Sequence, residues 1–268
     1  MARALQAAGA EATVLVRSPE VPEALGVAHH VCPRTLRPEV LRPRVLAHCE
    51  RLGADTLVID TFPEGLLGEL SGRWTGPRRV ALLRCRKDAT ARSFRAAVDA
   101  VEAAVDLEPH LDWLEARVPS LGPITRVSAT PSEHGQHALD VLVVASEARL
   151  LGFSQRLEPR LRALGLNVRV EDGTSFPLDL ERLRPRVLVG PAGFNLTYEA
   201  RALGIWHIAL PMPRSHDDQF KRAEAVAQVV RSPYALERLA AQLCRGASAP
   251  LQTPRHHPED VARFILDA

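Results

Sequence analysis

Residues 187–224 read VLVGPAGFNLTYEARALGIWHIALPMPRSHDDQFKRAE, and this stretch decides the fold. It contains an apolar run that ends in glycines, a helical segment closed by Gly204, a second apolar run that stops at Pro211, and a polar loop. Strand, helix and strand in this order form the unit from which parallel sheets are built. Ligands bind such sheets beyond the carboxyl ends of the strands. We therefore expect the functional residues in the two loops of this stretch.

The first loop has the features of an anion site. Gly190 and Gly193 have no Cβ, which lets the backbone approach a ligand closely. Asn195 is predicted to cap the following helix. The amides from Phe194 to Thr197 then direct N–H groups at the loop, and a helix N-terminus of this kind suits a diphosphate.

Polar side chains at the same edge suit a sugar. Glu199 lies one turn into the helix, and its carboxylate can accept from both hydroxyls of a ribose. Asp218 and Gln219 follow the next strand, so right-handed topology predicts them at the same edge. Arg214 and His216 lie in the same polar loop, where an arginine can offset diphosphate charge. Purely structural interpretations stay open: Glu199 as a solvated helix residue, Asp218 as a helix cap, and Arg214 as a surface arginine.

The rest of the chain repeats this alternation. We predict strands at 13–16, 55–60, 79–83, 103–107, 139–145, 166–170, 186–189, 205–210 and 228–230. We predict helices at 2–8, 39–51, 64–70, 91–102, 150–163, 178–184, 196–203, 218–226, 234–244 and 258–266. Residues 119–137 are rich in Pro, Gly, Ser and Thr, which indicates a linker region. The expected fold is α/β, with two doubly wound parallel-sheet (Rossmann-like) domains at 1–124 and 137–268, joined by a linker at 125–136.

Several spaced positions in 187–224 resemble the nucleotide-sugar signature of GT-B glycosyltransferases. The likeness is greatest to glycosyltransferase family 28, which includes the N-acetylglucosaminyltransferase that makes lipid II. The residues that carry it are Gly193, Thr197, Glu199, Gly204, Pro211, Asp218, Gln219, Arg222 and Ala223. The likeness extends more weakly over the C-terminal half. In the N-terminal half, 60–70 and 121–126 correspond to a strand-end acidic loop and an interdomain linker.

The resemblance implies roles for individual residues. Glu199 would hold the uridine ribose, the amides of 193–197 the diphosphate, and Asp218 with Gln219 the donor sugar. Asp60, at the end of a predicted strand, is the candidate general base. The full set expected to bind substrate comprises Gly190, Gly193, Phe194, Asn195, Leu196, Thr197, Glu199, Arg214, His216, Asp218 and Gln219.

The chain also departs from the family pattern. Trp206 stands where a Pro is usual, and Ala145, Ser146 and Glu147 replace a Gly-Ser loop. Family members open with a strand and a Gly-x-Gly-His loop, whereas ARALQAAGAEATVLVRSPE (2–20) resembles the first helix and second strand. The resemblance therefore implies an N-terminal sheet that lacks its central strand, with two open strand edges. Either the sequence begins downstream of the natural start, or the protein is a degenerate paralogue that never had the loop.

The composition and the spacing of residues argue against several classes of partner and binding site. Net charge is +2, from 34 basic and 32 acidic residues, which argues against a nucleic-acid partner. The four cysteines are widely spaced, which predicts buried thiols, and there is no D-x-D motif or ligand-spaced His/Cys cluster for a metal. We find no signal peptide and no transmembrane segment, and expect a cytoplasmic protein without a cofactor.

The predicted function is metal-independent transfer of a sugar from a UDP-sugar to an unknown acceptor, lipid- or saccharide-linked. The donor would be UDP-N-acetylglucosamine or a related hexose. Two alternatives remain open. One is a nucleotide-sugar hydrolase or epimerase, and the other is a non-catalytic glycosyltransferase-like subunit.

Overall fold

The protein divides into two compact units. The computed structural model describes residues 1–16, 26–33, 35–65, 67–87, 91–108, 118–125, 127, 137–146, 148–172, 178–230, 233–246 and 258–268. Unit 1 comprises Met1–Ile124 together with His256–Ala268, and unit 2 comprises Thr125–Arg255. The end of the chain thus belongs with unit 1, whereas the sequence analysis assigned it to the C-terminal domain. Most of the expected linker, 126 and 128–136, lies outside the described residues.

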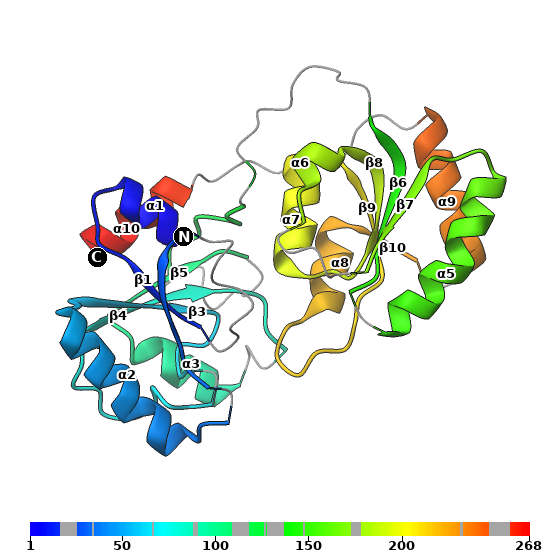
Figure 1. Cartoon of the computed structure of the whole chain (residues 1–268). Helices are drawn as coiled ribbons and strands as arrows, with labels where there is room; N and C mark the ends of the chain where they lie inside the picture. The colour runs from blue at the N-terminus through cyan, green and yellow to red at the C-terminus, as the bar shows by residue number, and fades with distance from the viewer. Residues whose placement is uncertain are drawn as a thin grey trace. The chain divides into compact units, whose positions relative to one another are not determined.

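Unit 2 is built on a parallel sheet of five strands in the order β10-β9-β8-β6-β7 (Figure 1). The strands are β6 (Leu139–Val144), β7 (Val168–Glu171), β8 (Pro185–Gly190), β9 (Trp206–Ala209) and β10 (Gln228–Val229). The central strands β6 and β8 are in register, with Val141 opposite Val187 and Val143 opposite Val189. All four of these valines are buried. Near-continuous apolar strands of this kind form because both faces of a parallel sheet are covered.

Helices cover both faces of this sheet. On one face lie α5 (Ala148–Ala163) and α9 (Pro233–Gly246), whose leucines pack against β6, β8 and β9. On the other lie α6 (Leu180–Leu183), α7 (Phe194–Ala202) and α8 (Gln219–Val226). Unit 2 is therefore a doubly wound, Rossmann-like domain, as the sequence predicts.

Unit 1 has the same alternation of strands and helices. Its strands are β1 (Thr13–Val16), β2 (Ala28–Val31), β3 (Thr56–Asp60), β4 (Arg78–Leu83) and β5 (Ala103–Asp106). Figure 1 shows α2 (Pro38–Leu52) and α3 (Arg92–Asp99) on one side of the strands, and α1 (Ala2–Ala7) and α10 (Pro258–Asp267) on the other. Arg78 in β4 donates to the Ile265 carbonyl oxygen of α10 at 2.6 Å, which ties the last helix to the sheet.

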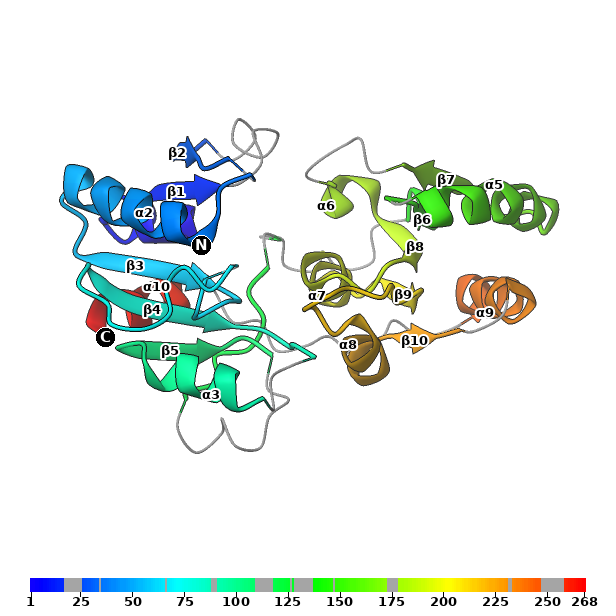
Figure 2. The same ribbon diagram turned by 90° about the horizontal axis from the view of Figure 1, so that it is seen from below.

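The strands of unit 1 form two parallel sheets, β1-β2 and β3-β4-β5. Figure 2 shows them in the succession β2, β1, β3, β4, β5. Helix α2 spans both sheets, because Leu41 and Val45 belong to one apolar cluster with Leu15 of β1 and Ile59 of β3. Among the described strands, β1 and β3 are not paired with each other.

Several local predictions are wrong. Residues 64–70 were expected to be helical, but Gly65 and Gly68 adopt φ of 82° and 81°, which is outside the helical region. Residue 66 lies outside the described residues. Strand β2 was not predicted, since its sequence AHHV contains two histidines. Helix α3 ends at Asp99 rather than at residue 102.

All four cysteines are buried free thiols, as the sequence predicts. Within the described residues, no helix has the length and apolar character needed to cross a bilayer.

Candidate functional site

The glycine loop ends at the start of α7. Gly193 is the N-cap residue in an extended conformation, and no side chain caps the helix. Asn195 lies inside the first turn, so its predicted role as the N-cap is wrong. The Thr197 amide donates to the Gly193 carbonyl oxygen at 3.0 Å. The amides that precede it belong to the first turn, whose N–H groups have no intrahelical acceptor. The positive end of the α7 dipole is therefore at the first turn, formed by Phe194, Asn195 and Leu196.

The two glycines of the loop are in different surroundings. A Cβ on Gly190 would lie 3.1 Å from Val144 Cβ and 3.3 Å from the Val144 carbonyl oxygen. Gly190 therefore allows β8 to approach β6 closely. This packing, rather than the predicted approach to a ligand, requires a glycine at position 190. A Cβ on Gly193 would meet no atom within 4 Å. The open space of the loop is therefore at Gly193.

Polar groups lie buried along α7. Thr197 and Glu199 are 1% and 3% exposed. Thr197 Oγ1 has no hydrogen-bond partner among the described residues. His207, on the neighbouring strand β9, is also buried, and burial lowers the pKa of its imidazole from 6.5 to about 4. Helix α7 and strand β9 thus both carry buried polar side chains.

The polar loop after β9 leads into α8. Gln219 is buried, and its Oε1 accepts from the Met212 amide at 3.0 Å, which fixes the start of the loop. Asp218 caps α8, because its Oδ1 accepts from the Lys221 amide at 3.2 Å. The structural interpretation of Asp218 as a helix cap is therefore correct. A contact of its carboxylate with a sugar remains a prediction.

Arg222 joins the two predicted loops. Its side chain is fully buried, Nη1 donates to the Ala192 carbonyl oxygen at 2.9 Å, and Nη2 lies 2.7 Å from Asp217 Oδ1. The guanidinium also lies over the Phe194 ring, 5.8 Å from its centroid. The structure thus brings the glycine loop and the polar loop together within unit 2.

Arg222 is part of the family signature, but neither Arg222 nor Asp217 is among the residues predicted to bind substrate. A signal for Arg222 was present, because Gln219, Arg222 and Ala223 are spaced i, i+3, i+4 and share one buried face of α8.

The remaining predicted residues are Arg214, His216 and Asp60. Arg214 is exposed and His216 is half-buried in the loop that precedes α8. Asp60 ends β3 in unit 1 and is exposed. Its Oδ2 lies 2.8 Å from Arg84 Nη2, and its Oδ1 accepts from Thr61 Oγ1 at 3.1 Å. Thr61 has a φ of 72°, a strained value for a β-branched residue. No group of three or more His, Cys, Asp and Glu suited to a metal occurs in the described part of the chain.

No protein-family model and no curated protein sequence matches the chain. Solved structures do match over nearly the full length. MurG of Acinetobacter baumannii is 14% identical, with a TM-score of 0.63, and the match covers 100% of this chain and 94% of MurG. The glycosyltransferase SsfS6 of Streptomyces sp. SF2575, in complex with thymidine diphosphate, is 18% identical, with a TM-score of 0.61 and coverage of 100% and 94%. The glycosyltransferase SnogD of Streptomyces nogalater is 14% identical, with a TM-score of 0.56 and coverage of 99% and 93%.

Identities this low establish the architecture alone. The chain is similar to these three proteins in the order and type of its elements across both units. From its fold, the protein is a two-domain α/β protein of the GT-B type.

Proposed function

We propose that this protein is a glycosyltransferase that binds a UDP-sugar in unit 2 and transfers the sugar to an acceptor. The observation that carries the proposal is the positive end of α7 beside the open space at Gly193. Arg222 holds this loop to the Asp217 loop, so that one rigid edge contains both sets of predicted contacts.

The start of α7 suits the chemistry of the leaving group. When the glycosidic bond breaks, negative charge develops on the diphosphate. Backbone N–H groups and the positive end of the helix dipole stabilise such charge without a metal ion. The amides of Phe194, Asn195 and Leu196 supply these groups, and Arg214 adds a cation from the polar loop. Glu199 would then accept from the ribose hydroxyls, and Asp218 and Gln219 would bind the sugar.

One structural neighbour supports a pyrimidine nucleoside diphosphate as the ligand. SsfS6 was solved with thymidine diphosphate bound, at 18% identity to this chain. Thymidine diphosphate lacks the ribose 2′-hydroxyl that Glu199 is proposed to bind. A comparison of UDP with 2′-deoxy-UDP therefore tests directly whether Glu199 binds the ribose of the donor.

The proposal predicts that UDP binds more tightly than 2′-deoxy-UDP in calorimetry. Glu199→Ala should weaken UDP binding by roughly 1–3 kcal/mol, since it removes hydrogen bonds to a charged group. Glu199→Ala should also remove the preference for UDP over 2′-deoxy-UDP. The matched control is Glu224→Ala, which deletes an exposed carboxylate of the same unit. Unchanged UDP affinity in Glu199→Ala would remove Glu199 from the site.

Metal independence is part of the proposal. Turnover of a UDP-sugar with a candidate acceptor should survive a chelator. Loss of activity that magnesium or manganese restores would show that a metal takes part.

A non-catalytic nucleotide-sugar-binding subunit is the second candidate function. It is favoured by the state of Asp60, the proposed base, because both of its oxygens already have protein partners, Arg84 and Thr61. Release of UDP from a UDP-sugar distinguishes the candidates. An enzyme releases UDP faster when an acceptor is present, a hydrolase does so in water alone, and a subunit binds the donor without releasing UDP.

A further inference from the structure

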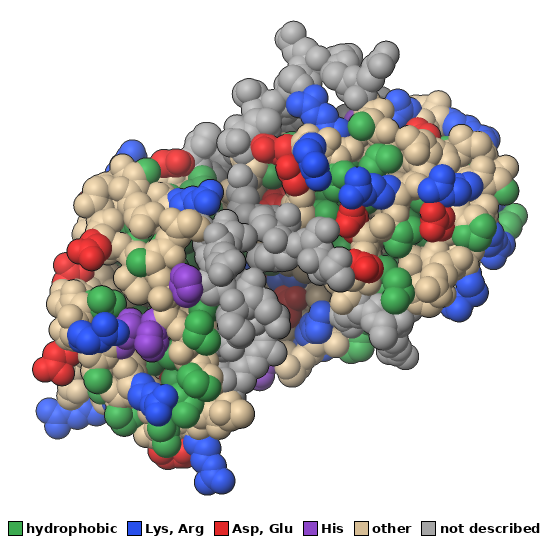
Figure 3. Space-filling view, in the orientation of Figure 1, with side chains coloured by type: hydrophobic (Ala, Val, Ile, Leu, Met, Phe, Trp, Pro, Cys, Tyr) green, Lys and Arg blue, Asp and Glu red, His purple; other side chains and the backbone are tan. Residues whose placement is uncertain are grey.

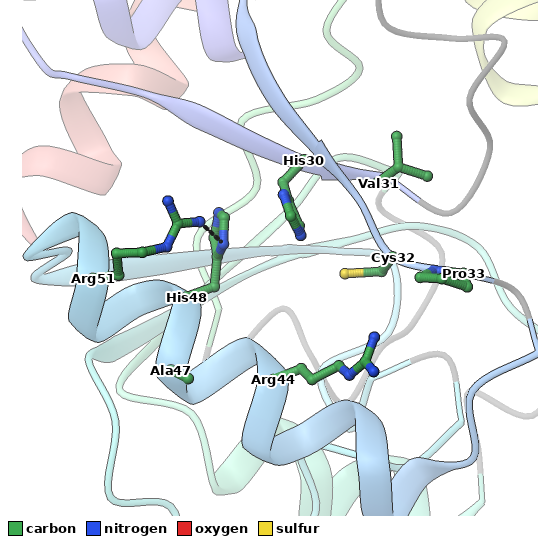
Figure 4. Close-up of a pocket in the computed structure, with 8 residues that line it drawn as sticks. All are labelled: His30, Val31, Cys32, Pro33, Arg44, Ala47, His48 and Arg51. Carbon is green, nitrogen blue, oxygen red and sulfur yellow. Dashed lines mark hydrogen bonds between the residues drawn. The ribbon is translucent and has the colours of Figure 1, made fainter.

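Unit 1 contains a cavity of about 340 Å³ between β2 and α2 (Figure 4). His30 and Cys32 line it from β2 and the residue that follows, and Arg44, His48 and Arg51 line it from α2. The three α2 residues are spaced i, i+4, i+7, which places them on one face of the helix. The cavity is thus formed by one helix face against the last residues of a strand.

Positive charge dominates the cavity. Arg44 and Arg51 are both exposed and sit two helical turns apart, and Figure 4 shows the His30–His48 pair between them. The two imidazole rings are in contact, with centroids 4.4 Å apart. The lining residues include no aspartate or glutamate. Figure 3 shows histidine side chains beside lysine or arginine side chains at the surface of unit 1.

The hydrogen bond between Arg51 and His48 fixes which groups donate. Arg51 Nη2 lies 2.6 Å from His48 Nδ1. Because a guanidinium can only donate, Nδ1 is the acceptor and the proton of the neutral ring is on Nε2. His48 Nε2 has no hydrogen-bond partner among the described residues. Burial, with His30 and Arg51 nearby, lowers the pKa of His48, so the ring is a neutral donor.

The edge of the sheet adds one backbone donor. The Cys32 amide donates to the Val16 carbonyl oxygen at 2.7 Å. In a parallel ladder, alternate amides point to opposite sides of the strand, so the Val31 amide points away from β1. Pro33 and Ala47 give the cavity an apolar part as well. A ligand that fits must be rich in acceptors, negatively charged, and attached to a small organic group.

We propose that this cavity binds a small soluble phosphate monoester, with Arg44 and Arg51 on the phosphate and Pro33 and Ala47 against its organic part. A phosphate monoester carries a charge of about −1.5 to −2 at pH 7, which matches two guanidinium groups, whereas a carboxylate carries only one charge. Arginine binds phosphate with two parallel N–H donors, which gives affinity and orientation. The volume is within the range of small-ligand sites. This site is independent of the nucleotide site proposed in unit 2.

The test is calorimetry of the full chain with glycerol 3-phosphate as the probe. Arg44→Ala and Arg51→Ala should each weaken binding about tenfold or more, as for loss of charge-assisted hydrogen bonds. The matched control is Arg37→Ala, because Arg37 is an exposed arginine at the start of the same helix that does not line the cavity. Arg37→Ala should bind like the wild type, within about twofold. Thermal unfolding shows whether each variant remains folded.

A measurement on the unaltered protein complements the variants. Glycerol 3-phosphate should shift the side-chain nuclear magnetic resonance signals of His30 and His48. It should leave those of His29 unchanged, because His29 points to the opposite face of β2. Equal affinity of Arg44→Ala, Arg51→Ala and Arg37→Ala would overturn the proposal, as would acetate binding as tightly as the phosphate ester. Binding only to vesicles that contain phosphatidic acid would also overturn it, because the ligand would then be a membrane surface.

Discussion

Gly190 and Gly193 lie three residues apart, and the structure separates a packing role from a ligand-binding role. Gly193 has an ordinary φ of −67°, and a Cβ at this position would meet no atom within 4 Å. Gly193→Ala should therefore lower the unfolding temperature only slightly, because alanine is a poorer N-cap than glycine. It should weaken UDP binding about tenfold or more, because the methyl group would occupy ligand space. Gly190→Ala should lower the unfolding temperature, since its Cβ would press on Val144.

Calorimetry and thermal unfolding of the two variants check this pair. If Gly193→Ala retained full UDP affinity, the open space at Gly193 would not be the diphosphate site.

His207 makes the stability of unit 2 depend on pH. Burial lowers the pKa of His207 from 6.5 to about 4 in the folded protein. As the pH falls below 6.5, the unfolded chain binds this proton before the folded protein does, so the free energy of unfolding decreases. The decrease in the free energy of unfolding begins as the pH falls through 6.5, and it reaches about 3 kcal/mol near pH 4.

Urea unfolding of His207→Leu and of the wild type between pH 7 and pH 4 measures this effect. The variant should lack this part of the pH dependence. The exposed control His29→Leu should retain it. A pH dependence that is identical in His207→Leu and the wild type would contradict burial as the cause.

At the residue scale, the sequence indicated which loops carry the polar residues better than it indicated the exact structural position of each residue. It predicted that residues 190–199 and 214–219 act together, and Arg222 does connect these loops. It could not show that Gly193 rather than Asn195 begins α7, because a helix can start at either residue without altering the hydrophobic period. It also missed the cavity at His48, which depends on the packing of α2 against β2.

At the scale of elements, the main irregularity of unit 1 is that β1 and β3 have no pairing with each other among the described strands. All four residues of β1 are half-buried, as are Thr56, Leu57 and Val58 of β3, whereas β4 is buried almost throughout. The Met1 amino group lies within electrostatic reach of Asp60, at the carboxyl end of β3. A strand fused ahead of Met1 would therefore end beside β3 and run parallel to it.

Fusion of five β-branched residues and a short loop ahead of Met1 should raise the unfolding temperature of unit 1 by at least about 4 °C, because it would pair both edges. A Gly/Ser extension of equal length is the control and should have no effect. An equal response to both extensions in thermal unfolding would show that the edges need no further strand.

Element boundaries depended on local chemistry. Strong apolar runs such as LDVLVV (139–144) predicted their strands closely. The histidines of β2 hid that strand, and Gly65 and Gly68 prevented a helix that the apolar residues suggested. Left-handed glycines are not visible in a hydrophobic period.

At the scale of the whole molecule, the chain returns to its first unit at its end. Helix α10 buries Val261, Ala262 and Ile265 in unit 1, each at most 1% exposed. Ile265→Ala should destabilise unit 1 by about 2–5 kcal/mol, because it leaves a cavity in the core. Leu266→Ala, at a site that is 45% exposed, is the control and should change stability by no more than about 0.5 kcal/mol.

Hydrogen exchange locates the effect. Amides of β3, β4 and β5 should lose protection in Ile265→Ala, while those of β6 and β8 keep theirs. Loss of protection in β6 and β8 instead would place α10 with unit 2. The sequence did not indicate this return, because an amphipathic C-terminal helix fits the surface of either domain.

Nucleotide binding in unit 2 is the central claim, and calorimetry of the unaltered chain with UDP and with uridine tests it most directly. We propose that the first-turn amides of α7 hold the diphosphate, so UDP should bind at least about tenfold more tightly than uridine. Equal affinity for UDP and uridine, or no binding of UDP, would contradict it.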